Sequence, residues 1–241
     1  MAHPGERAGA GGKAGAVRPE GKVAGLLLAA GGGRRLGGRP KALLDPPGRP
    51  RGGQPPPGGG GGGAGPPAGA PPRGAPGRPP HAARVLRDGG CGPVHIVLGA
   101  AAETVRTRAE LAGYGISVNP DWAQGMGSSL RVGLTALAGS GADAVVVSLV
   151  DQPGIGAAAV ARVVAAYTGR DALAAAAYGG ERGHPVLFGA ERWADIAASA
   201  EGDRGARAYL RRHAGAVTLV ECGDVAEAYD IDTPEDLRRL E

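Results

Sequence analysis

The sequence predicts an α/β fold of three layers, in which a mostly parallel sheet lies between two layers of helices. Short apolar runs alternate with segments of helical composition along most of the chain. The apolar runs are continuous, as in strands that are buried on both faces of a parallel sheet. The run at 23–30 also leads into the glycines 31–33, and loops after such strands are where α/β sheets bind ligands.

The individual elements follow from these patterns. We expect strands at 23–30, 94–98, 116–118, 144–150, 172–177, 185–188 and 217–220. We expect helices at 103–111, 128–137, 157–167, 191–199, 204–213 and 234–240. Gly127, Ser128 and Ser129 are expected to cap the helix at 128–137.

Two segments lack the composition of a packed core. Residues 1–21 have no apolar periodicity, and we expect a disordered tail there. Residues 46–80 contain thirteen prolines and thirteen glycines, with six consecutive glycines at 58–63. Proline removes hydrogen-bond donors and glycine has a large ordering entropy, so this segment is expected to be disordered. The sequence therefore predicts one domain over 22–241, interrupted by an insert at 46–80.

Composition excludes several classes of protein. The formal charge is +4, but the arginines are dispersed and aromatics make up only 3% of residues, which argues against a nucleic-acid partner. No run of about 18 apolar residues could span a membrane, and the N-terminus lacks the apolar core of a signal peptide. Cys91 and Cys222 are expected to be reduced thiols, so we expect a cytoplasmic protein.

The glycine-rich loop after the first strand has the chemistry of a phosphate site. Glycines let backbone N–H groups approach phosphate oxygens, and Arg34, Arg35 and Lys41 supply positive charge. Two better-known phosphate loops do not fit. The dinucleotide fingerprint needs a glycine where Leu36 stands, and the P-loop needs Lys-Ser/Thr where the sequence has 39–40, Arg-Pro.

The loop at 28–41 instead resembles the signature LAAGxSxRMGxxK of the NTP transferases typified by the molybdenum-cofactor nucleotidyltransferases. Further segments are similar to family motifs and follow in sequence order: GMGSSL at 125–130, DQP at 151–153, GHPVLF at 183–188 and DIDTPEDL at 230–237. The resemblance covers about residues 22–45 and 81–241. It implies a Rossmann-like nucleotidyltransferase topology.

The resemblance also implies roles for individual residues. Nucleotide would be bound by Leu28, Ala29, Ala30, Gly31, Gly32, Gly33, Arg35, Lys41, Ser128 and Ser129. The catalytic residues would be Arg35, Lys41 and Asp151, and the acceptor would meet Gly183, His184 and Pro185. Asp151 and Asp232 would hold Mg²⁺. Asp230 is a competing assignment, because it lies two residues away on the same side of an extended segment. A helix N-cap is the alternative role for Asp232.

The implied reaction is attack by an acceptor phosphate on the α-phosphorus of an NTP, which expels pyrophosphate. This chemistry needs positioning and charge neutralisation more than a protein base. The alanines at 29–30 are typical of the cytidylyltransferase branch, so we expect CTP as donor, molybdopterin as acceptor and a molybdoenzyme as a further partner. The alternatives are guanylylation of a small phosphorylated acid and a degenerate accessory protein that binds nucleotide without turnover. The failed fingerprint disfavours an NAD-binding protein.

The resemblance is interrupted directly after the loop. Family members have a shorter segment here, with a helix that packs on the sheet, and residues 82–87 are similar to its end. The Gly, Pro, Ala and Arg composition of 46–80 is typical of a shifted GC-rich reading frame. We interpret the segment as an insertion or a frameshift that removes most of this helix.

Overall fold

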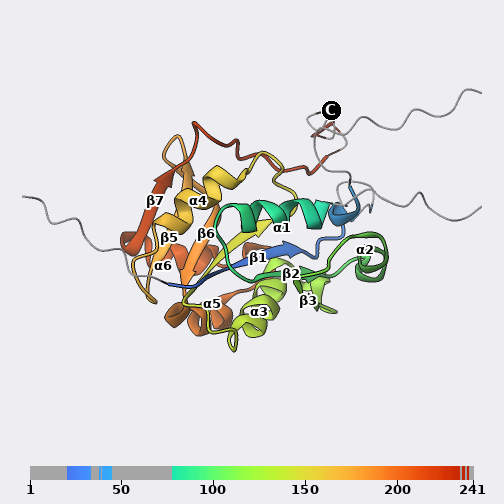
Figure 1. Cartoon of the computed structure of the whole chain (residues 1–241), viewed down its shortest axis with the longest axis horizontal. Helices are drawn as coiled ribbons and strands as arrows, with labels where there is room; N and C mark the ends of the chain where they lie inside the picture. The colour runs from blue at the N-terminus through green and yellow to red at the C-terminus, as the bar shows by residue number, and fades with distance from the viewer. Residues whose placement is uncertain are drawn as a thin grey trace, which may run out of the picture.

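The computed structural model describes residues 21–33, 38, 40–44, 78–233, 235, 236 and 238. Within this part, seven strands form one sheet in the order β3-β2-β1-β4-β6-β5-β7, with helices on both faces (Figure 1). The strands are β1 (Val23–Ala29), β2 (Val94–Leu98), β3 (Gly115–Val118), β4 (Ala144–Leu149), β5 (Leu173–Tyr178), β6 (Glu181–Gly189) and β7 (Val217–Glu221).

The sheet is mixed but mostly parallel. β1 lies between β2 and β4 and is parallel to both, and β3 and β7 also join parallel neighbours. β6 is antiparallel to β4 and to β5, with which it forms a hairpin. The expected α/β fold is therefore confirmed, with one strand running against the others.

The helices form two layers, one on each face of the sheet. They are α1 (Arg78–Asp88), α2 (Ala102–Arg108), α3 (Met126–Leu137), α4 (Ala157–Ala165), α5 (Trp193–Ser199) and α6 (Arg207–Arg212). Side chains of α1, α2 and α4 pack in one hydrophobic cluster, and those of α3, α5 and α6 pack in another on the opposite face. Short 3-10 helices lie at η2 (Lys41–Leu43), η3 (Trp122–Gln124), η4 (Ala190–Arg192), η5 (Gly202–Arg204) and η6 (Ala214–Ala216).

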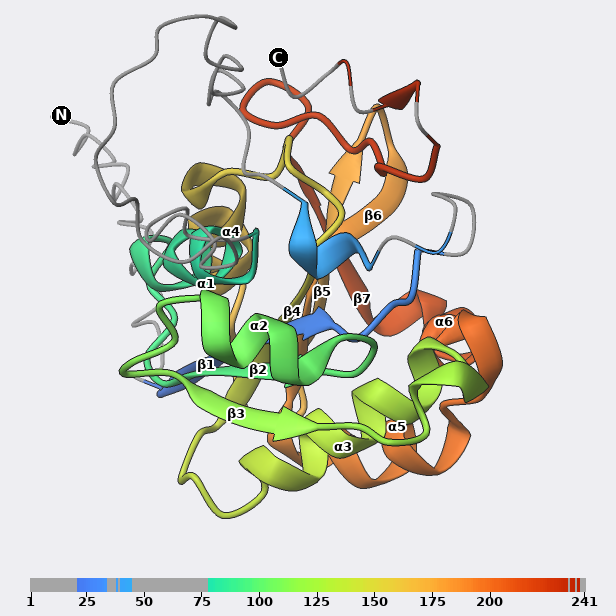
Figure 2. The same cartoon turned by 90° about the vertical axis from the view of Figure 1, so that its right-hand side faces the viewer.

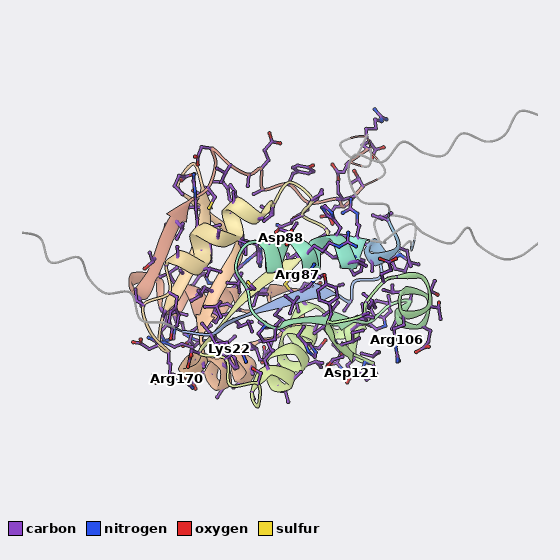
Figure 3. The ribbon with its side chains drawn as sticks, viewed as in Figure 1. Lys22, Arg87, Asp88, Arg106, Asp121 and Arg170 are labelled. Carbon is purple, nitrogen blue, oxygen red and sulfur yellow. The ribbon has the colours of Figure 1, made fainter. Side chains whose placement is uncertain are left out.

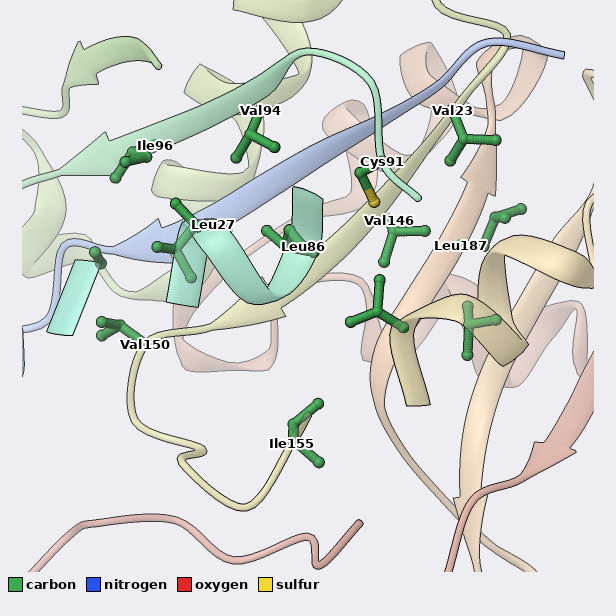
Figure 4. Close-up of a cluster of buried hydrophobic side chains, with 14 of the residues drawn as sticks. Val23, Leu27, Leu86, Cys91, Val94, Ile96, Val146, Val150, Ile155 and Leu187 are labelled. Atoms are coloured by element: carbon green, nitrogen blue, oxygen red, sulfur yellow. The ribbon is translucent and has the colours of Figure 1, made fainter. Parts of the chain in front are cut away.

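β1 shows why a continuous apolar run forms the centre of such a sheet. All seven of its residues are buried. Since side chains alternate along a strand, Leu26 belongs to the cluster on the α3 side and Leu27 to the cluster on the α1 side. Figure 4 shows Leu27 with Leu86 of α1 and Val146 of β4, none of which is exposed to solvent. Burial on both faces accounts for the absence of polar residues in this strand.

Two expectations about element boundaries are wrong. The expected insert reached Pro80, but α1 begins at Arg78, so residues 78–80 are helical. The interpretation that the insert removes most of the helix packing on the sheet is also wrong, since α1 has 11 residues and its Leu86 packs in one cluster with Leu27 of β1. Pro79 and Pro80 fit there because the first turn of a helix needs no backbone donors. The helix expected at 128–137 begins at Met126, so the expected capping residues 127–129 lie inside its first turn.

Other predicted segments cannot be compared with the structure. Residues 1–20, which make up nearly all of the expected tail, lie outside the described residues, as do residues 46–77 of the expected insert. Most of the helix expected at 234–240 also lies outside them. Among the helices that are described, none is long and apolar enough to cross a membrane.

Candidate active site

The loops that follow β1 and β4 leave the sheet side by side. Leu28 and Leu149 are register partners, and the amide of Val150 donates to the carbonyl oxygen of Leu28 at 3.2 Å. Because the two strands are parallel, the glycines after β1 and Asp151 after β4 emerge at the same edge. Figure 2 views the molecule from this end. Lys22, just before β1, lies toward the other end of the molecule from Asp121 (Figure 3).

At this edge Lys41 joins two carboxylates. Its ammonium nitrogen Nζ lies 2.6 Å from Oδ2 of Asp151 and 2.5 Å from Oδ1 of Asp232. All three side chains are largely buried, with exposed fractions of 15%, 19% and 32% for Lys41, Asp151 and Asp232. Burial by itself would lower the pKa of Lys41, but the charges and hydrogen bonds of Asp151 and Asp232 outweigh it and raise that pKa above its ordinary value.

The C-terminal segment reaches this site through a small apolar contact. Ile231 is fully buried and packs with Leu44, next to the turn η2 that carries Lys41. The amide of Ile231 also donates to the carbonyl oxygen of Asp151 at 2.9 Å. These contacts bring Lys41, Asp151 and Asp232 together from distant parts of the sequence.

The structure also shows how Asp232 is oriented. The carboxylate of Asp236 accepts hydrogen bonds from the amides of Asp232 and Thr233 at 3.1 and 2.9 Å. The amide of Asp236 in turn donates to the hydroxyl of Thr233 at 3.3 Å. This reciprocal pattern is a capping box between Thr233 and Asp236. The N-cap role weighed for Asp232 is therefore filled by Thr233, and the Asp232 carboxylate faces Lys41.

Asp230, the competing candidate for a metal ligand, has a different contact. Its carboxylate accepts a hydrogen bond from Nε2 of Gln152 at 2.8 Å. This contact ties the C-terminal segment to the residue after Asp151. The structure thus brings Asp232 to the lysine, and Asp230 to the neighbouring glutamine.

The arrangement of the two carboxylates fits a divalent cation. Their oxygens converge on one point, which the Lys41 ammonium occupies. Within the described residues, no three His, Cys, Asp or Glu side chains gather as a metal site. Two carboxylates are what Mg²⁺ commonly takes from a protein when substrate phosphates and waters supply its other ligands.

The glycine loop lies at the same edge, but its first residues differ in exposure. Leu28, Ala29 and Ala30 are buried in or next to β1, so they can reach a ligand only through their backbone. Gly31 is exposed and a Cβ there would meet nothing within 4 Å. Gly33 has a φ of 62°, and its carbonyl oxygen accepts from the amide of Gly38 at 3.1 Å. Arg35 lies outside the described residues.

Ser128 and Ser129 contact other protein groups. Nδ2 of Asn119 donates to the Ser128 hydroxyl at 2.8 Å and to the Ser129 hydroxyl at 2.9 Å. The Ser128 hydroxyl donates in turn to carbonyl oxygens of Asp121 and Gly125. All three polar side chains are buried. In the structure this network holds residues 119–129 together, and a nucleotide contact by the two serines remains a prediction.

Trp122 is a site residue that the sequence reasoning missed. A Cβ at Gly32 would lie 2.7 Å from Cζ3 of its ring, so the indole rests on the glycine loop. The available signal was its rarity: the chain has two tryptophans, and this one stands three residues before the GMGSSL segment at 125–130.

The predicted acceptor residues lie on β6, in the hairpin with β5. The hydroxyl of Tyr178 donates to the carbonyl oxygen of His184 at 2.7 Å, and a Cβ at Gly183 would lie 2.9 Å from the Tyr178 ring. Desolvation lowers the pKa of His184 to about 4, against the opposing charge of Asp230. His184 is therefore a neutral imidazole at neutral pH. Contact of Gly183, His184 and Pro185 with an acceptor remains a prediction.

A Rossmann-like sheet with a glycine loop, a lysine and two carboxylates at one edge defines a protein of the nucleotidyltransferase class. The chain belongs to the family of the MobA-like NTP transferase domain, whose model matches residues 80–217. The expected family is thereby confirmed. The match begins after the glycine loop and Lys41, so the roles of these residues are not given by it.

Similarity to individual proteins extends over more of the chain. The chain is 40% identical over 167 residues to nicotine blue oxidoreductase of Paenarthrobacter nicotinovorans, a match that covers 66% of this chain and 80% of that protein. Its structure is similar to that of the Mycobacterium tuberculosis Rv0371c homologue from Mycobacterium sp. strain JC1, with 29% identity, a TM-score of 0.66 and coverage of 91% and 94%. The manganese complex of Rv0371c from M. tuberculosis H37Rv gives 25% identity, a TM-score of 0.64 and coverage of 91% and 97%.

Proposed function

We propose that this protein transfers a nucleoside monophosphate from an NTP to a phosphate group on an acceptor and releases pyrophosphate. The observation that carries the proposal is the convergence of Lys41, Asp151 and Asp232 at the edge where the glycine loop leaves β1. This edge combines groups for a polyphosphate with groups for its counter-cation. Membership of the NTP transferase family supports the same chemistry.

The chain's own groups would divide the work of binding. The backbone N–H groups of residues 31–33 would approach the triphosphate, and Lys41 and Arg35 would neutralise its charge. An acceptor phosphate oxygen would form a bond to the α-phosphorus, while the bond from that phosphorus to the bridging oxygen breaks and pyrophosphate leaves. Since the nucleophile is already anionic, the protein contributes positioning and charge stabilisation rather than a base.

We further propose that Asp151 and Asp232 hold Mg²⁺. When bound, this ion would neutralise charge on the phosphates of the NTP. The two aspartates supply the hard oxygen ligands that such a cation requires. The manganese complex of the similar Rv0371c structure supports a divalent ion in this group of proteins.

The proposal extends to the identities of the nucleotide donor and the phosphate acceptor. The alanines at 29–30 favour CTP, and the family resemblance favours molybdopterin as the acceptor, with a molybdoenzyme receiving the product. We place this reaction in the cytoplasm. The hairpin residues 183–185 would meet the acceptor. A Cβ at Gly183 would lie 3.9 Å from Cβ of Ala228, in the C-terminal segment whose Asp230 accepts a hydrogen bond from Gln152, the residue after Asp151.

Pyrophosphate release with molybdopterin and each NTP in turn tests the proposal. We expect release with CTP and Mg²⁺, and a loss of about 100-fold or more in Asp151→Ala. Asp232→Asn should weaken Mn²⁺ binding in calorimetry, whereas the matched variant Asp230→Asn should leave it unchanged. Release with GTP and a small phosphorylated acid would favour the guanylyl alternative. Nucleotide binding without pyrophosphate release for any pair would indicate an accessory protein.

An oxidoreductase is the second candidate, and the 40% identity to nicotine blue oxidoreductase favours it. The fingerprint of dinucleotide-binding loops is missing, since Leu36 stands at the third glycine position. Incubation with nicotine blue and NADH or NADPH, followed by absorbance, separates the two candidates. Oxidation of the reduced nicotinamide that depends on nicotine blue would establish this activity.

A further inference from the structure

Trp122 bridges two glycines that belong to different loops at the candidate site. A Cβ at Gly99, directly after β2, would lie 2.6 Å from Cβ of Trp122. A Cβ at Gly32 would lie 2.7 Å from Cζ3 and 2.8 Å from Cη2 at the far edge of the same indole. The side chain therefore runs from the end of β2 to the loop after β1 and packs directly on backbone at both ends.

The backbone that carries Trp122 is held by the buried network around Asn119. The amide of Asn119 donates to the carbonyl oxygen of Leu98 at 2.7 Å, and its Oδ1 accepts from the amide of Asp121 at 3.0 Å. The Ser128 hydroxyl donates to the carbonyl oxygen of Asp121 at 3.0 Å. These bonds fix the residue before Trp122 to the sheet and to α3, so the indole is presented from a rigid support.

Trp122 is not part of the hydrophobic core. It is absent from both large clusters of buried residues, whereas Trp193 is buried in one of them. Its side chain, which is only partly buried, covers glycines at the candidate ligand-binding edge. An aromatic side chain in such a place contributes packing to the loop rather than to the core.

We propose that Trp122 is a positioning residue for the glycine loop, which holds the backbone at Gly32 in the conformation that receives the triphosphate. That the ligand is a triphosphate rests on the proposed function, whereas the effect of Trp122 on the conformation of the loop does not. Gly32 does not have a positive φ, so backbone conformation does not require a glycine there. A side chain at this position would instead collide with the indole. The glycine at this position is thus explained by Trp122 itself.

The first test measures the loop without any ligand. Hydrogen exchange of peptides covering residues 25–33 should be faster in Trp122→Ala than in the wild type, and little changed in Trp122→Phe, which keeps a ring. Exchange in the peptides of α4, which packs on the face of the sheet opposite α3, serves as the internal control for global unfolding. Equal exchange at 25–33 in all three proteins would overturn the inference.

The second test measures binding of CTP with Mg²⁺ by calorimetry. Trp122→Ala should raise the Kd for CTP by about 10-fold or more, because backbone N–H groups that are out of position bind the phosphates less tightly. Trp122→Phe should retain most of the affinity for CTP. The tryptophan fluorescence of the wild type should change on binding, and that change should be lost in Trp122→Phe, which retains only Trp193. Unchanged affinity in Trp122→Ala would count against the inference.

A pair of substitutions tests the contact itself. Gly32→Ala should weaken CTP binding in the wild type, where its Cβ meets the indole, but should add little in the Trp122→Ala protein. Gly139→Ala, whose Cβ meets nothing within 4 Å, is the matched control and should have no effect. Additive effects of the two substitutions would overturn the inference. If the wild type binds no NTP while the exchange of 25–33 still depends on Trp122, the proposed function fails and the positioning role stands.

Discussion

The ammonium nitrogen of Lys41 lies 2.6 Å from Asp151, a residue 110 positions further along the chain, and 2.5 Å from Asp232. The lysine therefore occupies the point on which two carboxylates converge. A divalent ion bound by the same oxygens would have to take its place. Lys41 would then be available to the phosphates that arrive with the ion.

Replacement of Lys41 should separate these two roles. In Lys41→Met the carboxylates lose a competing cation, so Mn²⁺ should bind about 10-fold more tightly in the absence of nucleotide. Pyrophosphate release should fall by about 100-fold or more, because a cation facing the triphosphate is lost. Calorimetry with MnCl₂ and the release assay measure the two effects. Lys22→Met is the control, because Lys22 precedes β1 and the site lies beyond the other end of that strand. Weaker Mn²⁺ binding in Lys41→Met would contradict the competition.

Arg78 should stabilise the backbone directly before Asp151. Its side chain is 2% exposed, and Nη1 donates to the carbonyl oxygen of Val150 at 3.3 Å. Arg78→Met keeps most of the apolar stem but removes the donor, which should cost about 1–3 kcal/mol in the free energy of unfolding. Urea denaturation measures this loss. Arg84→Met, on the same helix but in an exposed ion pair with Glu110, should cost less than about 1 kcal/mol; equal losses would refute the role of Arg78.

Acid should destabilise the protein partly through His184. Its folded pKa is lowered to about 4 from the ordinary value of 6.5, chiefly by desolvation. Because folding lowers this pKa, the contribution of His184 to the free energy of unfolding is complete above pH 6.5. As the pH falls toward 4, up to about 3 kcal/mol of this stability is lost. Urea midpoints between pH 4 and pH 7.5 should fall less steeply in His184→Asn than in the wild type. Parallel curves for the two proteins would show that His184 contributes nothing to acid sensitivity.

The part of the insert that precedes α1, residues 46–76, should be largely dispensable. We expect the fold to survive replacement of residues 46–76 by a short Gly/Ser linker, because η2 ends at Leu43 and α1 begins only at Arg78. Circular dichroism and pyrophosphate release should match those of the full chain, and loss of the folded state would contradict the expectation. Sequencing of the coding DNA and transcript separates an insertion from a frameshift, since a clean frame with an active protein would exclude the latter.

Much of the fold was open to prediction because its signals are local. The strand at 94–98 was predicted with the observed bounds, and those at 23–30 and 144–150 within one residue, since a strand buried on both faces must be apolar throughout. Boundaries were wrong where local signals conflict with packing. Pro79 and Pro80 were assigned to the insert, yet a first helical turn accepts proline.

The sequence by itself determined the sheet's apolar strands, the glycine loop and the family, because these depend on residue types that stand next to one another. Only the tertiary structure decided which distant side chains meet. Asp230 and Asp232 are equivalent by spacing, and it is the capping box of Thr233 and Asp236, with the burial of Ile231, that turns Asp232 toward Lys41. The buried hydrogen bonds of Ser128 and the indole of Trp122 on Gly32 were equally outside its reach. Such contacts depend on the register and packing of elements far apart in the chain, which no local pattern records.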